Sequence, residues 1–386
     1  MRKILLVPDS FKGTLSSKQV CVIMKEQLQR FFPESTIVSL PVADGGEGSV
    51  DAFLTAAGGE RKDVSVTGPY GKPVQGFYGV LPDKKTAVIE IAACAGLPLV
   101  GENLNPEMTT TYGVGELILD AVHGGCTEIV LGLGGSCTND GGVGAAVALG
   151  AKFYRSDGSE FLPTGGTLKD IDKIDCAALR NSLHGVRMIA MCDIDNPLYG
   201  ENGAARVFAS QKGADVSMIE RLDNGLSHLG EIVSQYLGKD YSKIPGAGAA
   251  GGMGFGVVAF CGAKLQMGID VMLNIIGFDN LLHSADLVFT GEGKLDSQSL
   301  RGKVISGVST HCLQFGVPVI AVVGQIGSGF KPLYERGLTA VFSINPSAKP
   351  FSESRYHASE NLSLTMESLA RLICVSSKFS SNCFLI

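Results

Sequence analysis

EIVLGLGGSCTNDGGVGAAVAL, residues 128–149, places an apolar run, a glycine-rich loop and a small-residue helical pattern in immediate succession. The run Glu128–Leu131 predicts a buried strand, and Val143–Leu149 predicts a helix. Between them, five of the eleven residues from Gly132 to Gly142 are glycine, which costs conformational entropy unless the bare backbone serves a purpose. The usual purpose is close approach of a ligand, very often a phosphate, to main-chain N–H groups. The stretch therefore predicts an α/β fold with an anion-binding loop.

The same strand–loop–helix pattern occurs at both ends of the chain. Lys3–Val7 is continuously apolar, as a strand buried on both faces should be, and apolar residues then recur at helical spacing from Ser16 to Phe32. The C-terminal third alternates in the same way, with expected strands at Asp286–Thr290, Val317–Val323 and Ala340–Ile344 and a closing helix at Ala358–Ile373. Such alternation predicts a doubly wound parallel sheet.

The middle of the chain differs. Val64–Thr67, Pro73–Leu81 and Thr86–Ile91 are strand-like pieces with turn signals and no helix between them, which indicates a mixed or antiparallel patch. We therefore expect two lobes. One is a doubly wound α/β domain built from residues 1–65 and 285–386, and the other is an inserted mixed α/β domain at residues 66–284.

Composition excludes several classes of protein. The chain has 386 residues, of which 45% are hydrophobic and 18% charged, and its longest apolar runs fall short of the roughly 18 residues of a membrane span. The net charge is −6 and no basic run is present, so nucleic acid and membrane are poor partners. The ten cysteines and six histidines show no metal-binding spacing, which argues against zinc. We expect a cytoplasmic protein whose oligomeric state, a homodimer included, the sequence leaves open.

Three further loops combine glycine with charged residues after expected strands: PDSFKG at residues 8–13, ADGGEG at 43–48 and TGEGKLDSQS at 290–299. Open α/β sheets bind ligands at the carboxyl ends of their strands. The three loops contain the following candidate residues for binding substrate, phosphate or metal: Asp9, Ser10, Lys12, Asp44, Glu47, Glu292, Lys294 and Asp296. Ordinary turn chemistry explains each loop taken alone, but explains three on one sheet edge less well.

Two segments of the middle add to this set. MCDIDNPLYG, residues 191–200, ends an expected strand with Asp193, and PGAGAAGGMGFG, residues 245–256, leads into a helix. Close helix packing explains the second segment about as well as ligand binding does. The opening loop itself offers Gly134, Gly135, Ser136, Asn139 and Asp140.

The residue types favour phosphoryl transfer. Cys137 stands where a dinucleotide fingerprint needs glycine, and no Gly-Lys pair has P-loop spacing. Carboxylates for Mg²⁺, with lysine and N–H groups for phosphate oxygens, are what a kinase requires. A nucleotide-dependent oxidoreductase and a nucleotide-sensing binding protein on a Rossmann-like fold remain the alternatives.

Six motifs together resemble the type I glycerate kinase family: VPDSFKG, PVADGGEGS, GLGGSCTNDGG, MCDIDNPL, PGAGAAGGMG and TGEGKLDSQSLRGKV, in this order over residues 2–374. The resemblance implies ATP-dependent phosphorylation of D-glycerate with Mg²⁺, a 2-phosphoglycerate product more than a 3-phosphoglycerate one, and a Rossmann- or flavodoxin-like lobe made from the two chain ends. Cys137 replaces the family's usual alanine. The tail Val375–Ile386 is not family-like, and we expect it to be disordered or altered; its last four residues formally fit a prenylation box, which we do not expect to be used.

A kinase of an alcohol needs a carboxylate that accepts the hydroxyl proton and another that holds Mg²⁺. We assign Asp193 as the base, with Asp296 as the next candidate, because the position of Asp193 after its strand has the fewest competing turn glycines. Asp44 and Asp296, with Glu47, are the predicted metal ligands. Lys12 and the N–H groups of Gly134–Ser136 are expected to bind the transferred phosphate or the substrate carboxylate. At least two of the candidate acids should only cap helices or close turns.

Overall fold

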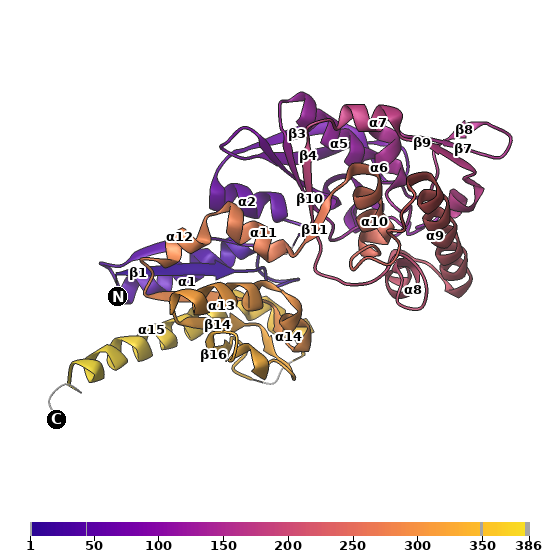
Figure 1. Ribbon diagram of the computed structural model, residues 1–386. Helices are drawn as coiled ribbons and strands as arrows, with labels where there is room; N and C mark the ends of the chain where they lie inside the picture. The colour runs from indigo at the N-terminus through magenta and orange to yellow at the C-terminus, as the bar shows by residue number, and fades with distance from the viewer. Residues whose placement is uncertain (1, 44, 348–349, 383–386) are drawn as a thin grey trace. The chain divides into compact units, whose positions relative to one another are not determined.

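The computed structural model describes residues 2–43, 45–347 and 350–382 of the chain (Figure 1). These residues form two compact units. The terminal unit comprises Met1–Ala43, Thr55–Ala57 and Ile269–Ile386, and the middle unit comprises Asp44–Leu54 and Gly58–Gly268.

A five-stranded parallel sheet forms the centre of the terminal unit. Its strands lie in the order β16-β14-β12-β1-β2, and every neighbouring pair is parallel. They are β1 (Lys3–Pro8), β2 (Thr36–Ser39), β12 (Leu287–Gly291), β14 (Val319–Val323) and β16 (Leu338–Ser343). Since β1 and β12 are neighbours, the two ends of the chain build one sheet.

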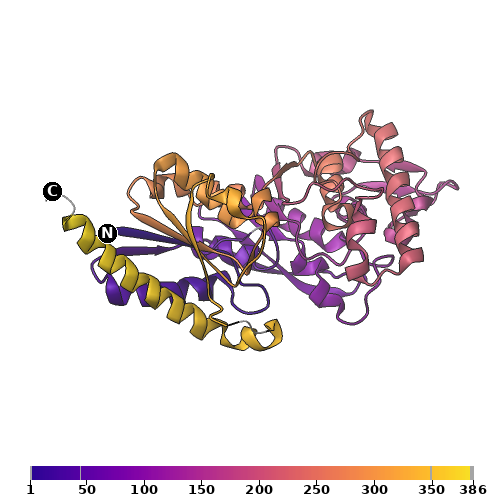
Figure 2. The same ribbon diagram turned by 90° about the horizontal axis from the view of Figure 1, so that it is seen from below.

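Helices cover both faces of this sheet. α1 (Ser17–Phe31) and α15 (Ala358–Asn382) pack against each other and share one apolar core with Leu6 of β1 and Phe289 of β12. α13 (Val304–Phe315) contacts β1 and β12 outside that core, on the face to which alternate residues of each strand point. Figure 2 shows α15 running along the unit toward the C-terminus. The doubly wound arrangement expected from the sequence is confirmed.

Shorter elements complete the terminal unit. They are α11 (Gly268–Ile275), α12 (Phe278–Leu282), β13 (Lys294–Leu295), η3 (Ser297–Arg301), β15 (Gln325–Ile326), η4 (Lys331–Leu333), α14 (Phe351–Ser354) and η5 (Arg355–His357). Residues 375–382 of the tail are helical. α15 continues to Asn382, because no glycine or proline interrupts the sequence after Ala358. The prenylation-like residues 383–386 lie outside the described residues.

A six-stranded mixed sheet forms the centre of the middle unit, in the order β11-β10-β6-β5-β4-β3. Its parallel strands are β5 (Thr86–Glu90), β6 (Glu128–Gly132), β10 (Arg187–Met191) and β11 (Lys264–Gln266). β4 (Pro73–Val80) and β3 (Glu60–Thr67) extend it in antiparallel fashion. The patch predicted from turn signals is therefore one edge of a larger sheet.

The other elements of the middle unit surround this sheet and a small second one. The helices are α2 (Ser49–Ala57), α3 (Ala92–Ala95), α4 (Leu97–Val100), α5 (Tyr112–His123), α6 (Val143–Ala148), η1 (Gly165–Asp170), α7 (Ala177–Ser182), α8 (Ala204–Phe208), η2 (Ser210–Lys212), α9 (Val216–Leu237) and α10 (Ala249–Cys261). The second sheet joins β7 (Lys152–Tyr154), β8 (Glu160–Phe161) and β9 (Lys173–Asp175). Within the described ranges, no helix combines the length and apolar character needed to cross a membrane.

Two glycine-rich segments of the middle unit lie in direct backbone contact. α10 contains three residues with non-helical dihedral angles, and one of them, Gly251, has a φ of 68°. A Cβ on Gly251 would lie 2.0 Å from the carbonyl oxygen of Thr138, and one on Gly256 would lie 2.5 Å from that of Gly141. The close approach of α10 to the loop after β6 thus explains Gly251, Gly252 and Gly256.

Replacing Gly251 tests this contact. Gly251→Ala places a methyl group against Thr138 and must push the two segments apart, so we expect the free energy of unfolding in urea to fall by about 3 kcal/mol or more. Gly262→Ala is the matched control, because Gly262 has nearly the same φ of 67° but nothing within 4 Å of the added Cβ. It should lose only the left-handed strain, about 1 kcal/mol. Equal losses in the two variants would contradict the close packing.

Candidate functional site

Two of the predicted loops meet at one edge of the terminal sheet. Pro8 and Gly291, the last residues of β1 and β12, are paired in register, and the N–H of Asp9 donates to the carbonyl oxygen of Gly291 at 2.9 Å. A Cβ on Gly293 would lie 3.3 Å from the nitrogen of Lys12, so the loop after β12 folds against the loop after β1. The terminal unit therefore gathers six of the predicted residues: Asp9, Ser10, Lys12, Glu292, Lys294 and Asp296.

The acids of these loops make local bonds. The Oδ1 atom of Asp9 accepts the N–H of Ser10 at 2.6 Å. Asp296 caps η3 through the N–H of Gln298 at 2.9 Å, and its Oδ2 lies 3.0 Å from the ammonium of Lys294. That hydrogen-bonded lysine holds the pKa of Asp296 below its usual range. The Asp296 carboxylate thus already has two partners in the protein.

Glu292 lies deeper in the same edge. Its side chain is buried and accepts a hydrogen bond from the hydroxyl of Ser299. Lys12 and Lys294 are exposed by contrast. The edge therefore combines buried acids with lysine side chains that reach solvent, an arrangement that can receive a ligand's phosphate oxygens.

In the middle unit, three parallel strands end at one edge of the mixed sheet. Glu90 of β5 and Met191 of β10 are both in register with Gly132, the last residue of β6. The glycine loop follows Gly132, and Asp193 follows β10. Half-buried Asp193 accepts the N–H of Gly268 at 2.8 Å through Oδ1. The predicted loop residues and the predicted base are therefore close to one sheet edge.

The segment Gly45–Gly48 lies against the same glycine loop. The N–H of Gly134 donates to the carbonyl oxygen of Gly45 at 2.9 Å, and a Cβ on Gly134 would lie 2.6 Å from Cα of Gly46. The sequence pattern grouped this segment with the terminal lobe, but its backbone contacts belong to the middle unit. Glu47 is exposed there, whereas Asp44 lies outside the described residues.

Hydrogen bonding distinguishes the three predicted donors of the glycine loop. The N–H of Gly134 is occupied by Gly45. Among the described residues, no acceptor faces the N–H groups of Gly135 and Ser136, and Gly135 is exposed at the tip of the loop. Two adjacent N–H groups of this kind form an anion-binding concavity. The structure therefore leaves Gly135 and Ser136 as the better donors.

Asp140 is fully buried and organises the loop from within. It accepts hydrogen bonds from the N–H and hydroxyl of Thr111, each at 2.8 Å, and from the N–H groups of Gly142 at 3.1 Å and Gly144 at 3.3 Å. Burial nevertheless raises its pKa. These bonds join the starts of α5 and α6, so Asp140 has the geometry of a helix-capping acid. Asn139, also fully buried, has no described partner for either amide atom.

Sequence reasoning missed Glu90 and Lys212, which are both buried and charged. Glu90 accepts the N–H groups of Val50 at 3.1 Å and Gly48 at 3.4 Å, which caps α2, and burial raises its pKa. The only sequence feature that could have pointed to Glu90 is that it is a single acidic residue in an otherwise apolar strand. Lys212 donates to the hydroxyl of Ser136 at 3.0 Å and to the carbonyl oxygen of Thr138 at 2.6 Å. An isolated lysine in a polar stretch gave no signal at all.

Comparisons with known proteins agree over almost the whole length. The family model described as "Glycerate kinase family" matches residues 4–374. A "Glycerate kinase" of Bacillus cereus is 43% identical over 97% of this chain and 99% of its own. A "Glycerate 2-kinase" of Escherichia coli is 41% identical over 97% of this chain and 98% of its own. A Salmonella typhimurium LT2 crystal structure assigned as glycerate kinase 2 superposes with a TM-score of 0.87 at 39% identity, covering 98% of this chain and 99% of that one.

Asp140→Asn tests the capping role of the buried acid. The amide keeps one acceptor oxygen, but its NH₂ group faces backbone N–H groups that the carboxylate accepts in the wild type. We therefore expect the free energy of unfolding to fall by about 3 kcal/mol. Urea denaturation followed by circular dichroism measures it. Asp172→Asn, at an exposed position of the same unit, should stay within about 0.5 kcal/mol of the wild type. A fully stable Asp140→Asn protein would show that the four bonds do not hold the loop.

Proposed function

The chain belongs to the glycerate kinase family, and we propose that it transfers the γ-phosphoryl group of ATP to D-glycerate, favouring 2-phosphoglycerate over 3-phosphoglycerate. One observation carries the proposal: a glycine loop of this family's pattern follows a parallel strand and has two adjacent N–H groups with no acceptor among the described residues. Phosphoryl transfer depends mainly on positioning and on stabilising charge at phosphoryl oxygens. A loop of fixed N–H donors supplies both.

We propose a role for each of two groups of residues. In the middle unit, the N–H groups of Gly135 and Ser136 bind anionic oxygens of the substrate. In the terminal unit, Lys12 lies in the loop after β1, against the loop after β12, and supplies positive charge to phosphate oxygens. Asp9, Ser10, Glu292 and Lys294 shape that loop pair, while Asn139 and Asp140 shape the glycine loop.

Asp193 remains the proposed base. Its Oδ1 is fixed by the N–H of Gly268, which orients the carboxylate at the end of β10. A carboxylate held in this way is able to accept the proton of the glycerate hydroxyl as that oxygen attacks phosphorus. Asp296 is less suited to the role, because Lys294 lowers the pKa of its carboxyl group and both of its oxygens have partners.

We propose Mg²⁺ as the metal of the reaction, entering with the triphosphate and neutralising charge on its oxygens. Among residues 2–43, 45–347 and 350–382, no group of three metal-binding side chains is preassembled. An ion that arrives on ATP keeps several waters and needs only one or two protein carboxylates. Exposed Glu47 fits that requirement better than Asp296, and Asp44 completes the proposed set.

The proposed location is the cytoplasm. Beyond D-glycerate and ATP, we propose no partner.

Activity and regiochemistry are tested together. The purified protein with ATP, Mg²⁺ and D-glycerate should release ADP only when glycerate is present, and ³¹P NMR of the product should give the spectrum of 2-phosphoglycerate. ADP release that does not depend on glycerate would contradict the proposed function. A 3-phosphoglycerate spectrum would overturn only the proposed position of transfer.

Lys12→Ala should lower kcat/KM by about 10²–10³-fold, because the lysine is proposed to stabilise phosphate charge in the transition state. Lys25→Ala, at an exposed position of α1 in the same unit, is the matched control and should keep wild-type kinetics. Steady-state ADP release measures both variants. Unchanged kinetics in Lys12→Ala would show that Lys12 is a surface residue without a role in catalysis.

Asp193→Asn should lower kcat by about 10²–10⁴-fold with little change in thermal stability, because the amide oxygen still accepts the N–H of Gly268 but cannot take a proton. Single-turnover phosphoryl transfer measures the chemical step directly. Asp172→Asn serves again as control. Full activity in Asp193→Asn would assign the base to another carboxylate.

A further inference from the structure

Lys212 carries a positive charge into the interior of the middle unit. Its side chain is only 2% exposed, at the end of η2. Its ammonium donates to the hydroxyl of Ser136 at 3.0 Å and to the carbonyl oxygen of Thr138 at 2.6 Å. Both acceptors are uncharged. An ammonium in such surroundings is costly unless an opposite charge accompanies it.

The protein provides an opposite charge nearby, in Asp140, but none bonded to the ammonium. In the described part of the chain, Lys212 forms no ion pair. The titratable groups that act on it are Cys137 and Asp140. Burial raises the pKa of the Cys137 thiol to about 12, so it stays neutral. The Asp140 carboxylate favours the ammonium electrostatically, but its hydrogen bonds go to Thr111, Gly142 and Gly144.

The ammonium lies beside the loop tip that is built for an anion. Its acceptor Ser136 follows exposed Gly135, and the N–H groups of these two residues have no acceptor among the described residues. An ammonium has three donors, and the two bonds above use two of them. One donor of Lys212 and two backbone N–H groups are thus left around the side chain of Ser136.

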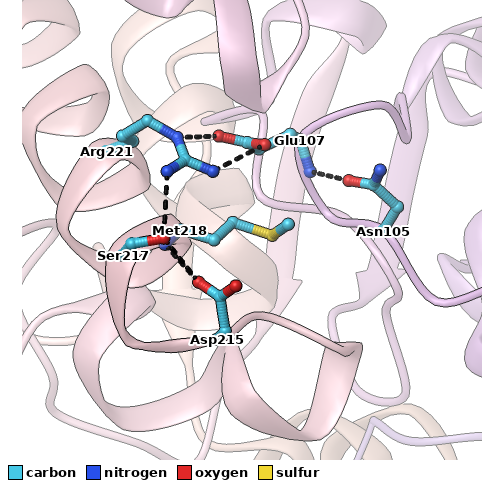
Figure 3. A network of polar contacts seen from close by, with 6 residues as sticks. All are labelled: Asn105, Glu107, Asp215, Ser217, Met218 and Arg221. Carbon is cyan, nitrogen blue, oxygen red and sulfur yellow. Dashed lines mark hydrogen bonds and ion pairs between the residues drawn. The ribbon is translucent and has the colours of Figure 1, made fainter.

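The backbone that carries Lys212 is firmly anchored. Gly213 has a φ of 94°, and a Cβ there would lie 2.4 Å from Cβ of Leu104. Asp215 caps α9 by accepting the N–H of Met218 at 2.8 Å. Figure 3 shows the guanidinium of Arg221 meeting both carboxylate oxygens of Glu107, at 2.7 and 3.2 Å. These contacts restrain the backbone that follows Lys212.

We propose that Lys212 supplies the positive charge for an anionic substrate oxygen bound at Gly135 and Ser136, so that the substrate adds the directly bonded anion that the ammonium lacks in the described part of the chain. The inference rests on the proposed function, which supplies two such oxygens: the carboxylate of glycerate and the transferred phosphoryl group. Both have the same chemistry, a delocalised anion that accepts several N–H donors.

A purely structural lysine behaves differently from a charge-supplying one. Burial lowers the pKa of Lys212 to about 8, so the amine loses its proton as the pH rises through 8. The neutral amine keeps two N–H donors, enough for Ser136 and Thr138. Deprotonation therefore leaves the loop clamp intact and removes only the charge, so kcat/KM should fall above about pH 8 if the charge matters.

Proton uptake on binding tests the inference in the wild-type protein. D-glycerate and MgATP are titrated separately by calorimetry at pH 8 and pH 6.5, each in two buffers of different ionisation enthalpy. An anion beside Lys212 raises its pKa, so the ligand responsible should take up about half a proton at pH 8 and almost none at pH 6.5. Uptake with glycerate identifies the carboxylate as the partner, and uptake with MgATP identifies the phosphoryl group. No uptake with either ligand overturns the inference.

Variants provide the second measurement. Lys212→Met should lose the proton uptake and about 10²-fold in kcat/KM, and Lys212→Arg should keep the charge and lose the decline above pH 8. Lys173→Met, at an exposed position of β9, should match the wild type in every respect. Circular dichroism checks folding, and if Lys212→Met does not fold, the wild-type calorimetry decides.

The failure of each proposal is recognisable. A wild-type protein that makes no ADP from ATP and glycerate contradicts the proposed function. An active wild type whose Lys212→Met variant keeps its kinetics and its pH profile contradicts only the role of Lys212.

Discussion

The buried carboxylate of Asp140 is the interaction on which the middle unit's loop geometry depends. A carboxylate away from water is tolerated only when its oxygens are hydrogen-bonded. Thr111 and the N–H groups of Gly142 and Gly144 meet that demand. Since these donors come from the starts of α5 and α6, one side chain determines how both helices begin beside the loop. The path of the backbone from β6 to α6 follows from that arrangement.

Because glycine has no side chain, three backbone segments are able to meet around this loop. Added Cβ atoms on Gly132 and Gly134 would collide with Gly45 and Gly46, and one on Gly251 would collide with Thr138. Contacts of this kind leave little room for movement, because backbone atoms cannot change rotamer. The conformational freedom that glycine gives an unfolded chain is thus lost in exchange for a rigid cradle. Rigid N–H donors stabilise developing charge without reorganising during the reaction.

Charge is distributed differently in the two units. In the terminal unit, charged groups find local partners, as Lys294 does with Asp296. In the middle unit, Lys212 is buried among neutral acceptors, while the acids Glu90 and Asp140 are occupied by backbone N–H groups. In the described part of the chain, the buried ammonium of Lys212 therefore has no carboxylate bonded to it, and an anionic ligand would complement it. Glycerate and ATP are both anions, which connects this ammonium with the family's reaction.

The sequence by itself determined the principal strands and helices and the glycine loops, because apolar periodicity and turn residues act over a few neighbouring positions. Lys3–Pro8, Glu128–Gly132 and Leu287–Gly291 are strands near their expected bounds. It also determined the family, because six ordered motifs rarely occur together by chance. Only the tertiary structure decided that Asp140 serves as a cap, that Gly45 packs on Gly134, and that Lys212 reaches Ser136, 76 residues away in the chain. Burial and hydrogen-bond partners arise from contacts between distant segments, and no local pattern of residues encodes them.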